Sequence, residues 1–117
     1  MKQLLTILVL LLTLNSFGQK QIELKDIQSH LGDTVKVCGM IYSGKYLSSA
    51  KGTPTFLNMG AEYPNQLLTI VIWAKEREAM KNNPETELVG KEMCLTGKVE
   101  QYKGKLQIVL RAALNKQ

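Results

Sequence analysis

The sequence has little with which to build a metal centre or a catalytic site. It contains two cysteines, one histidine and one tryptophan in 117 residues. His30 alone cannot complete a zinc site, and a solvated or helix-capping role suits it better. The sequence also lacks a glycine-rich nucleotide loop, a nucleophile with a base partner, and a carboxylate cluster suited to nuclease metal ions. We therefore expect no enzymatic activity, no metal and no cofactor.

The sequence also lacks an apolar run long enough to span a membrane. Its longest run, from Leu4 to Leu14, follows Lys2 and is itself followed by Ser16 and Gly18. A span needs about 20 apolar residues, whereas this order of charge, short apolar stretch and small residues is typical of a secretory signal. We expect cleavage after Gly18, with Ser16 as the next choice. The mature protein is then expected in the periplasm or outside the cell, without stable membrane insertion.

The chain is long enough for one compact core and too short for a second domain of ordinary size. Residues 1–18 are thus expected to be the signal peptide and residues 19–117 a single domain. Without Lys2 the chain carries 14 Lys+Arg and 10 Asp+Glu, a net charge of +4. Residues 34–61 hold three lysines and no acid, and residues 101–117 hold four basic residues and no acid. Such segregation can attract polyanions, although a mild lysine excess also keeps many small proteins soluble.

Alternating apolar residues predict five β-strands, because side chains along a strand point to opposite faces in turn. In the first strand Val35, Val37, Gly39 and Ile41 share the core face. Polar residues between the first two strands predict an exposed loop over residues 43–53. The strands are expected near residues 34–42, 54–59, 67–73, 93–99 and 106–110.

Two short helices accompany these strands in the prediction. Leu24, Ile27 and Leu31 recur at helical spacing before the first strand. Residues 74–82 are rich in helix formers and end before Pro84, which predicts a second helix between the third and fourth strands. The alternating charges of this second helix, Arg77 among them, are typical of a solvated face.

Three strands, one helix and two further strands are the order of the OB fold, a five-stranded Greek-key β-barrel. Gly39 and Gly97 lie inside strands, at positions where a small barrel bends sharply. An immunoglobulin-like sandwich is the rival, but it needs about seven strands and leaves the helix unexplained. The sequence therefore predicts an all-β OB barrel with a short N-terminal helix.

Several motifs in this order carry a resemblance to a known family. They are VCG in the first strand, SSAKGTPTFLN in the following loop and strand, YPNQ in a turn, and CLTGK in the fourth strand. The chain resembles small exported bacterial OB-fold proteins that are described as nucleic-acid-binding and are related to the anticodon-binding type of OB domain. The resemblance covers nearly the whole mature chain. It implies a role in binding for Tyr46, Ser48, Ser49, Lys51, Phe56, Asn58, Tyr63 and Asn65.

Basic residues in two loops point to the same kind of ligand. OB domains bind on the face of strands two and three, flanked by the loops between strands one and two and between strands four and five. Lys45 and Lys51 belong to the first loop, and Lys103 and Lys105 to the second. Single-stranded nucleic acid needs such positive charge for its phosphates and aromatic faces for its bases.

Four tyrosines, Tyr42, Tyr46, Tyr63 and Tyr102, are candidates for base stacking, whereas Phe56 and Trp73 lie in apolar runs and are expected in the core. The predicted nucleic-acid-binding residues are Lys45, Tyr46, Ser48, Ser49, Lys51, Asn58, Tyr63, Tyr102, Lys103 and Lys105.

Cys38 and Cys94 lie on the non-core side of the first and fourth strands, which pair antiparallel in an OB barrel. Export through an oxidising compartment favours a disulfide between them, and two buried, unlinked thiols are the alternative.

Two functions remain open at this stage. The first is an exported module that binds single-stranded DNA or RNA through the basic cleft, as the charge pattern and the resemblance suggest. The second is a module that uses the same barrel face for an envelope protein or a glycan, since free nucleic acid is scarce outside the cytoplasm.

Overall fold

The structure is a computed structural model, and it describes residues 20–115. The expected signal peptide, residues 1–18, lies outside the described residues. Within residues 20–115, none of the helices combines the length and the apolar character that crossing a membrane demands.

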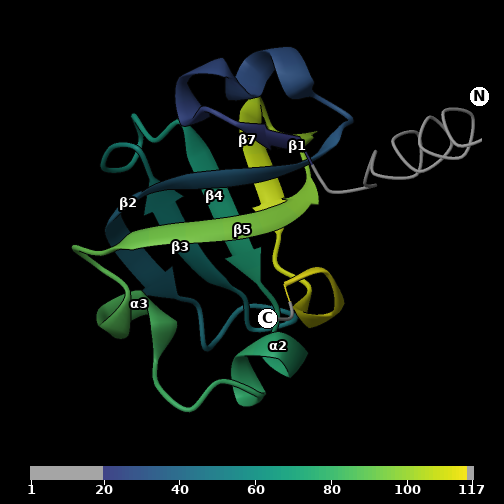
Figure 1. Cartoon of the computed structure of the whole chain (residues 1–117). Coiled ribbons are helices and arrows are strands. Elements are labelled where there is room, and N and C mark those ends of the chain that lie inside the picture. The colour runs from purple at the N-terminus through teal and green to yellow at the C-terminus, as the bar shows by residue number, and fades with distance from the viewer. Residues whose placement is uncertain (1–19, 116–117) are drawn as a thin grey trace, which may run out of the picture.

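Seven strands and a few short helices follow one another along the chain (Figure 1). In order they are β1 (Lys20–Ile22), the 3-10 helix η1 (Leu24–His30), β2 (Thr34–Tyr46), β3 (Thr55–Met59), β4 (Leu68–Ile72), α2 (Ala74–Glu78), α3 (Pro84–Glu87), β5 (Glu92–Lys98), β6 (Glu100–Tyr102), β7 (Lys105–Val109) and the 3-10 helix η2 (Ala112–Leu114).

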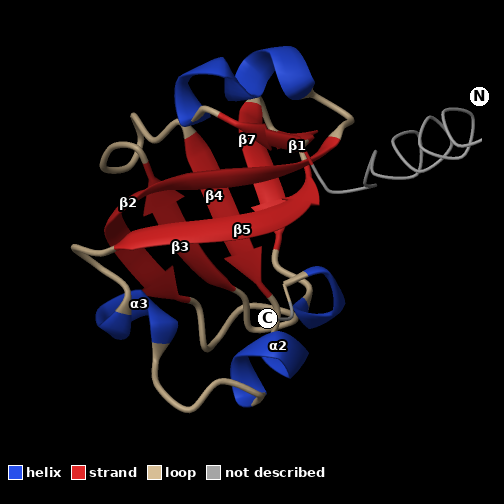
Figure 2. Cartoon of the chain, viewed as in Figure 1, coloured by secondary structure: helices blue, strands red, loops and turns tan. Residues whose placement is uncertain are grey.

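The strands form one curled, mixed sheet that gives the molecule the shape of a half-barrel. Its order is β1-β2-β3-β4-β7-β6, and β5 pairs with β2 outside this path. Figure 2 shows β2 and β5 crossing in front of β3, β4 and β7. The pairing of β2 with β5 is antiparallel, from Thr34 opposite Lys98 to Met40 opposite Glu92. The predicted antiparallel pairing of the first and fourth expected strands is therefore confirmed.

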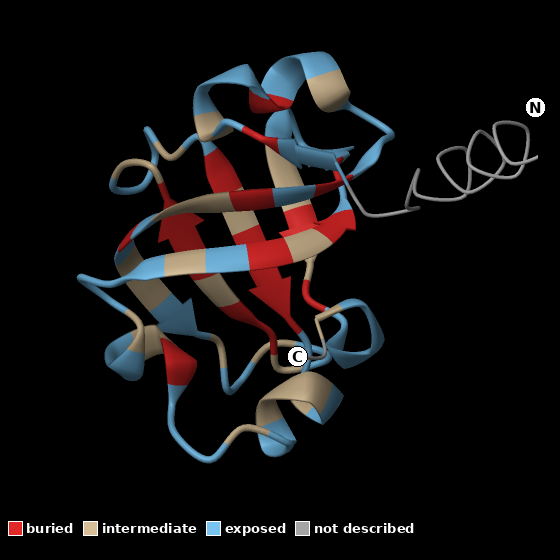
Figure 3. Ribbon diagram, in the orientation of Figure 1, coloured by how far each residue is buried: buried red, intermediate tan, exposed pale blue. Residues whose placement is uncertain are grey.

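The core fills the space inside the curl of the sheet (Figure 3). Side chains at alternate positions of the main strands point into it and are almost fully buried, as the alternating pattern predicts. They are Val35, Val37, Ile41, Leu57, Met59, Leu68, Ile70, Ile72, Leu95 and Ile108. The curl brings β5 so close to β7 that a Cβ atom built on Gly97 would collide with the Ile108 side chain. Glycine is required there because no larger residue fits.

A β-bulge in β2 changes which of its residues face the core. Ile41 pairs with Met59 but Ser43 pairs with Asn58, so Tyr42 is an extra residue without a partner on β3. One extra residue reverses the alternation. Ser43 and Lys45 consequently lie on the outer face of the sheet. The predicted loop over residues 43–53 is wrong for its first four residues, which continue β2 to Tyr46.

The ends of the half-barrel differ from the prediction in several details. The predicted first helix is the 3-10 helix η1, which covers one end of the half-barrel (Figure 2). The predicted helix over residues 74–82 ends at Glu78, and Pro84 begins the additional helix α3 at the other end. Proline suits the first turn of a helix because its missing N–H has no helical partner there.

Over residues 20–115 there are seven strands and not the predicted five. Five of them, β2, β3, β4, β5 and β7, correspond to the predicted strands. The additional strands β1 and β6 have three residues each, too few for an alternating pattern to be recognised.

Cys38 and Cys94 form a disulfide, as predicted, with an S–S distance of 2.01 Å. They are directly opposite each other in the register of β2 and β5. Cys94 is exposed and Cys38 is half-buried, which agrees with their predicted placement on the side away from the core. The bond joins two residues that are 56 positions apart in the sequence.

Breaking this disulfide should lower the free energy of unfolding by about 4 kcal/mol, the chain-entropy contribution of a loop of this length. Urea unfolding of the oxidised protein, the reduced protein and the Cys38→Ala, Cys94→Ala double variant measures the difference. Equal unfolding midpoints for all three would contradict the prediction, as would two thiols that react with an alkylating agent before any reductant is added.

Candidate binding groove

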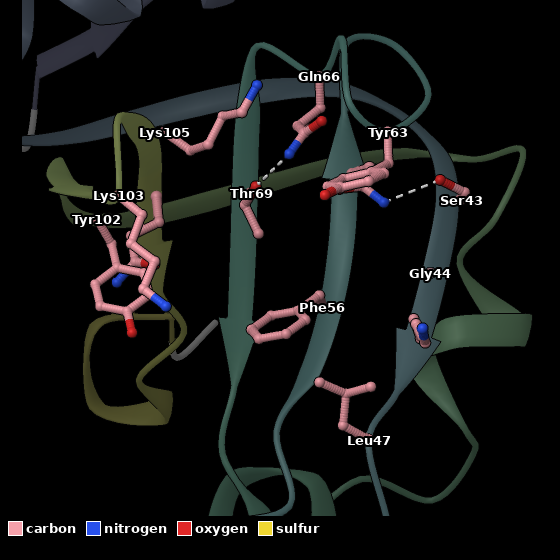
Figure 4. Close-up of a pocket in the computed structure, with 13 residues that line it drawn as sticks. Ser43, Gly44, Leu47, Phe56, Tyr63, Gln66, Thr69, Tyr102, Lys103 and Lys105 are labelled. Carbon is pink, nitrogen blue, oxygen red and sulfur yellow. Dashed lines mark hydrogen bonds between the residues drawn. The ribbon is translucent and has the colours of Figure 1, made fainter. Parts of the chain in front are cut away.

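The outer face of β2, β3, β4 and β7 carries an open groove of about 570 Å³ (Figure 4). We call it the outer groove. Its walls come from the loop between β3 and β4 and from the tight turn between β6 and β7. The lining residues are Ser43, Gly44, Lys45, Leu47, Phe56, Asn58, Tyr63, Gln66, Thr69, Tyr102, Lys103, Lys105 and Gln107.

Strand register builds the floor of the groove in two rows. Ser43, Asn58, Thr69 and Gln107 lie opposite one another on four neighbouring strands and form a polar row. Within it the Asn58 amide Nδ2 donates a hydrogen bond of 3.0 Å to the Ser43 hydroxyl. The next row places Phe56 between Lys45 on β2 and Val71 on β4. The floor therefore offers hydrogen-bonding groups beside an aromatic surface.

Gln66 adds a polar group above this floor. Its amide Nε2 donates a hydrogen bond of 2.9 Å to the hydroxyl of Thr69. Its carbonyl Oε1 is buried and has no hydrogen-bond partner among the described residues. Buried acceptors are usually paired, so among the described residues Gln66 is the one lining side chain with a buried polar atom that has no hydrogen-bond partner.

Three lysines lie around the groove, and none of the lining residues within the described chain is acidic. Lys45 lies on β2, whereas Lys103 and Lys105 lie in or beside the turn between β6 and β7. Positive φ angles of 50° at Lys103 and 79° at Gly104 are those of a type I′ turn, which keeps both lysines close to the sheet. The Lys105 ammonium also donates a hydrogen bond of 2.8 Å to the Pro64 carbonyl, across one end of the groove. The groove thus has a positive electrostatic field.

Aromatic rings stand on opposite sides of the groove. Tyr63 is 71% exposed and Tyr102 is 59% exposed, while Phe56 lies on the floor between them (Figure 4). The Lys103 ammonium lies 5.4 Å from the centre of the Tyr102 ring. Exposed rings beside cations are able to stack on flat, electron-rich groups.

The structure brings six of the ten sequence-predicted binding residues to this groove. Lys45, Asn58, Tyr63, Tyr102, Lys103 and Lys105 line it. Tyr46, Ser48 and Ser49 line a separate shallow depression with Leu47 and Ala50, and Lys51 lines neither. That any of them binds a ligand stays a prediction.

Two aromatic residues that were expected in the core lie elsewhere. Phe56 lines the groove, and Trp73 is 43% exposed. Phe56 occupies an outward position of β3, since Leu57 beside it is buried, and Trp73 directly follows β4 beside the buried Ile72. The alternation of Phe56 and Asn58 with Leu57 and Met59 was the sequence signal that could have placed Phe56 on the outer face.

Tyr46 packs within the fold, and its role in stacking on a ligand stays a prediction. The bulge turns its side chain toward the end of the half-barrel, where the Arg77 guanidinium lies 3.6 Å from the centre of its ring. Arg77 also donates hydrogen bonds to the Thr55 hydroxyl at 2.8 Å and to both carboxylate oxygens of Glu85, at 2.6 and 3.1 Å. This cluster of Tyr46, Thr55, Arg77 and Glu85 is called the arginine cluster below.

Arg77 and Glu85 are largely shielded from water, with side chains that are 14% and 16% exposed. The prediction of a solvated Arg77 was therefore wrong. Their mutual hydrogen bonds lower the pKa of Glu85 below its usual value and raise the pKa of Arg77. The cluster requires Gly44, because a Cβ atom at this position would lie 2.8 Å from the Cα atom of Glu85. Helix α3 thus rests on the end of β2 that carries Lys45 into the groove.

A second cluster of polar side chains lies around the disulfide. The ligand atoms of Cys38, Glu92 and Cys94 are within 4.8 Å of one another, as in many metal sites. Because the two sulfur atoms are bonded to each other, they cannot act as thiolate ligands. The cluster does not hold a metal while the disulfide is intact.

Comparison with known proteins gives no family for this chain: no protein-family model matches it, and no curated protein matches it. Among solved structures, it is similar to a protein of Klebsiella pneumoniae that is provisionally described as a nucleic acid-binding lipoprotein. The two share 22% identity with a TM-score of 0.46, over 73% of this chain and 72% of the other. A likeness of this degree does not assign a function.

Replacing Glu85 with glutamine should destabilise the protein by about 2 to 3 kcal/mol at pH 7, because Arg77 then keeps a shielded charge without its counterion. The pKa of Glu85 is lower in the folded state than in the unfolded state. Its contribution is therefore complete above about pH 4.3 and declines as the pH falls toward the folded value. Urea unfolding of both proteins between pH 7 and pH 3 should show their stability difference shrinking at the acidic end.

Glu87→Gln is the matched control for this experiment. Glu87 pairs with Lys91 at 3.3 Å, but both side chains are more than half exposed. An exposed pair contributes about 0.5 kcal/mol or less. An equal loss of stability in the two variants would show that the arginine cluster has no special role.

Proposed function

We propose that the protein is an exported, non-enzymatic binding module that holds single-stranded nucleic acid in the outer groove. One observation carries the proposal: three lysines and three aromatic rings converge on a groove whose lining, over the described residues, includes no carboxylate. Lysines can contact the phosphates while the rings stack on the bases, each stack contributing about 1 to 3 kcal/mol. Stacking of this kind needs bases that are not already paired and stacked in a duplex, so a single strand is the preferred ligand.

The arrangement of the strands supports an OB-type barrel as the scaffold. Three consecutive antiparallel strands, β2, β3 and β4, are followed by short helices and then by β5 and β7. The first strand of this set pairs with the fourth, β5. In OB domains the ligand face is that of the second and third strands, here β3 and β4, which supply Phe56, Asn58 and Thr69 to the groove.

A glycan is the second candidate ligand, and the polar row favours it. Ser43, Asn58, Thr69 and Gln107 present hydroxyl and amide groups that can bond to sugar hydroxyls, next to the ring of Phe56. An envelope protein is a further alternative for the same face. Neither needs the three lysines, so the response to salt separates these ligands from a polyanion.

Oligonucleotide binding should weaken steeply as salt rises. With three lysines on phosphates, the logarithm of the association constant should fall with the logarithm of the salt concentration at a slope of about −2. Lys103→Glu and Lys45→Glu should each weaken binding about five- to tenfold at 0.1 M salt and make the slope shallower. Titration of a fluorescent 12-nucleotide strand, followed by anisotropy, measures both quantities.

Lys36→Glu provides the control, because it makes the same change in charge at an exposed residue of β2 that lies opposite Thr96 and outside the groove lining. It should leave the affinity almost unchanged. Equal effects of all three variants would indicate binding to overall charge and not to the groove. Absence of oligonucleotide binding even at 10 mM salt would eliminate the proposal and leave the glycan or protein ligand.

Export is supported by the composition of residues 1–18 and by the disulfide, since such bonds persist in oxidising compartments. Expression in a bacterial host with the full N-terminal sequence should yield periplasmic or secreted protein whose first residue is Gln19. Intact-mass and N-terminal sequencing check the cleavage site. Protein that keeps Met1 and stays in the cytoplasm would contradict the expectation.

A further inference from the structure

Trp73 is the only tryptophan in the chain, and it is unusually exposed for its type. Its side chain is 43% exposed, although it ends an apolar run whose neighbour Ile72 is fully buried. Tryptophan is rarely buried completely, and the exposed part of this ring is available for contact with a ligand.

The alternation of β4, continued one residue past its end, places Trp73 on the side of the outer groove. Along β4 the outward positions are Thr69, which lines the groove, and Val71, which pairs with Phe56, and Trp73 continues this spacing in extended backbone directly after β4. Each step of two residues covers about 7 Å, so Trp73 follows the row of Phe56 at about that spacing. Val71 between the two rings is only 2% exposed, which shows that side chains cover the face continuously there.

The loop between β2 and β3 holds the indole ring in place. A Cβ atom built on Gly52 would lie 2.9 Å from Cζ3 and 3.1 Å from Cε3 of Trp73, so the ring packs directly on the backbone of Gly52. Gly52 has a φ of +79°, a conformation that side chains rarely adopt. The same loop begins with Leu47, which lines the groove. The same loop therefore lines the outer groove and packs against the Trp73 ring.

Two exposed cations lie near Gly52 or near the end of β4 by sequence and strand register. Lys51 directly precedes Gly52 and is exposed. Arg111 is also exposed. It comes two residues after Val109, which pairs with Val71 in the parallel ladder of β4 and β7. Neither residue forms an ion pair within residues 20–115. Both charges are free to contact phosphates.

We infer that Trp73 is a second stacking platform, on which a base of the bound strand lies after the chain has left the outer groove beside Phe56. This inference rests on the proposed function and extends it. It makes the ligand a strand of about four or more nucleotides, the lower end of the range for a single OB domain. It also gives Lys51, which lies outside the groove, a place beside the phosphate of that base.

Because Trp73 is the only tryptophan, its fluorescence reports on this platform alone. A 12-nucleotide oligo-dT should quench the emission of the mature protein, because a stacked base deactivates the excited indole. A dinucleotide, which fits the groove alone, should bind weakly and leave the emission nearly unchanged. A 12-mer that binds without altering the emission would overturn the inference.

The variant Trp73→Leu should bind the 12-mer about tenfold more weakly, while its affinity for the dinucleotide stays the same. Lys51→Glu should act in the same direction on the 12-mer. Met40→Ala is the matched control, since Met40 is 42% exposed and lines neither the groove nor the shallow depression. Circular dichroism and the thermal midpoint establish that each variant is folded, and the wild-type quenching result stands even where a variant is not.

The outcomes separate the two proposals. If neither oligonucleotide binds at low salt, the proposed function fails and the role of Trp73 fails with it. If the 12-mer binds in the groove but Trp73→Leu and the control have equal affinities, only the second platform is overturned.

Discussion

The arrangement of this protein depends on a single extra residue, Tyr42, in its longest strand. Before the bulge, β2 pairs with β5 and sends Val37 and Ile41 into the core. After it, β2 pairs with β3 and sends Ser43 and Lys45 to the outer face. If Tyr42 were paired in a regular ladder instead of forming the bulge, the alternation would continue through it, and the Lys45 ammonium would point into the apolar interior at a high cost in solvation. The bulge therefore separates the half of β2 that builds the core from the half that builds the groove.

Each half of β2 is fixed by its own strong interaction. The disulfide between Cys38 and Cys94 joins the first half to β5. The arginine cluster holds the second half, because α3 packs on Gly44 and Arg77 lies over Tyr46. A groove between two fixed ends can keep its lysines and rings in place before any ligand arrives, and such preorganisation reduces the entropy lost on binding. The short elements around it are then needed mainly to close the ends of the half-barrel.

The sequence was sufficient to predict the strands with strong alternation. It was also sufficient to predict the disulfide, because the same period of two places Cys38 and Cys94 on the side away from the core. It was not sufficient for the bulge, which has no sequence signal of its own here, and so Tyr46 was assigned to a loop and not to the end of β2. Phe56 and Trp73 were assigned to the core because each belongs to an apolar run. For Phe56 the alternation with Leu57 still indicated the outer face. The continuous apolar run that ends at Trp73 masks the period, and there only the fold decides which face meets water. The groove lysines Lys103 and Lys105 were placed correctly because a tight turn leaves little freedom to its residues.

Charge distribution explains why a net charge of only +4 can coexist with a strongly basic groove. The acid-free segments, residues 34–61 and 101–117, supply all three lysines of the groove. The acids concentrate instead in residues 76–92, where Glu85 forms an ion pair with Arg77 and Glu87 forms one with Lys91. Glu85 and Glu87 are paired and belong to α3 at the helical end of the half-barrel, so they do not cancel the field of the groove. The relevant quantity for a ligand is therefore the local charge on the outer face, which the fold assembles from two segments distant in sequence.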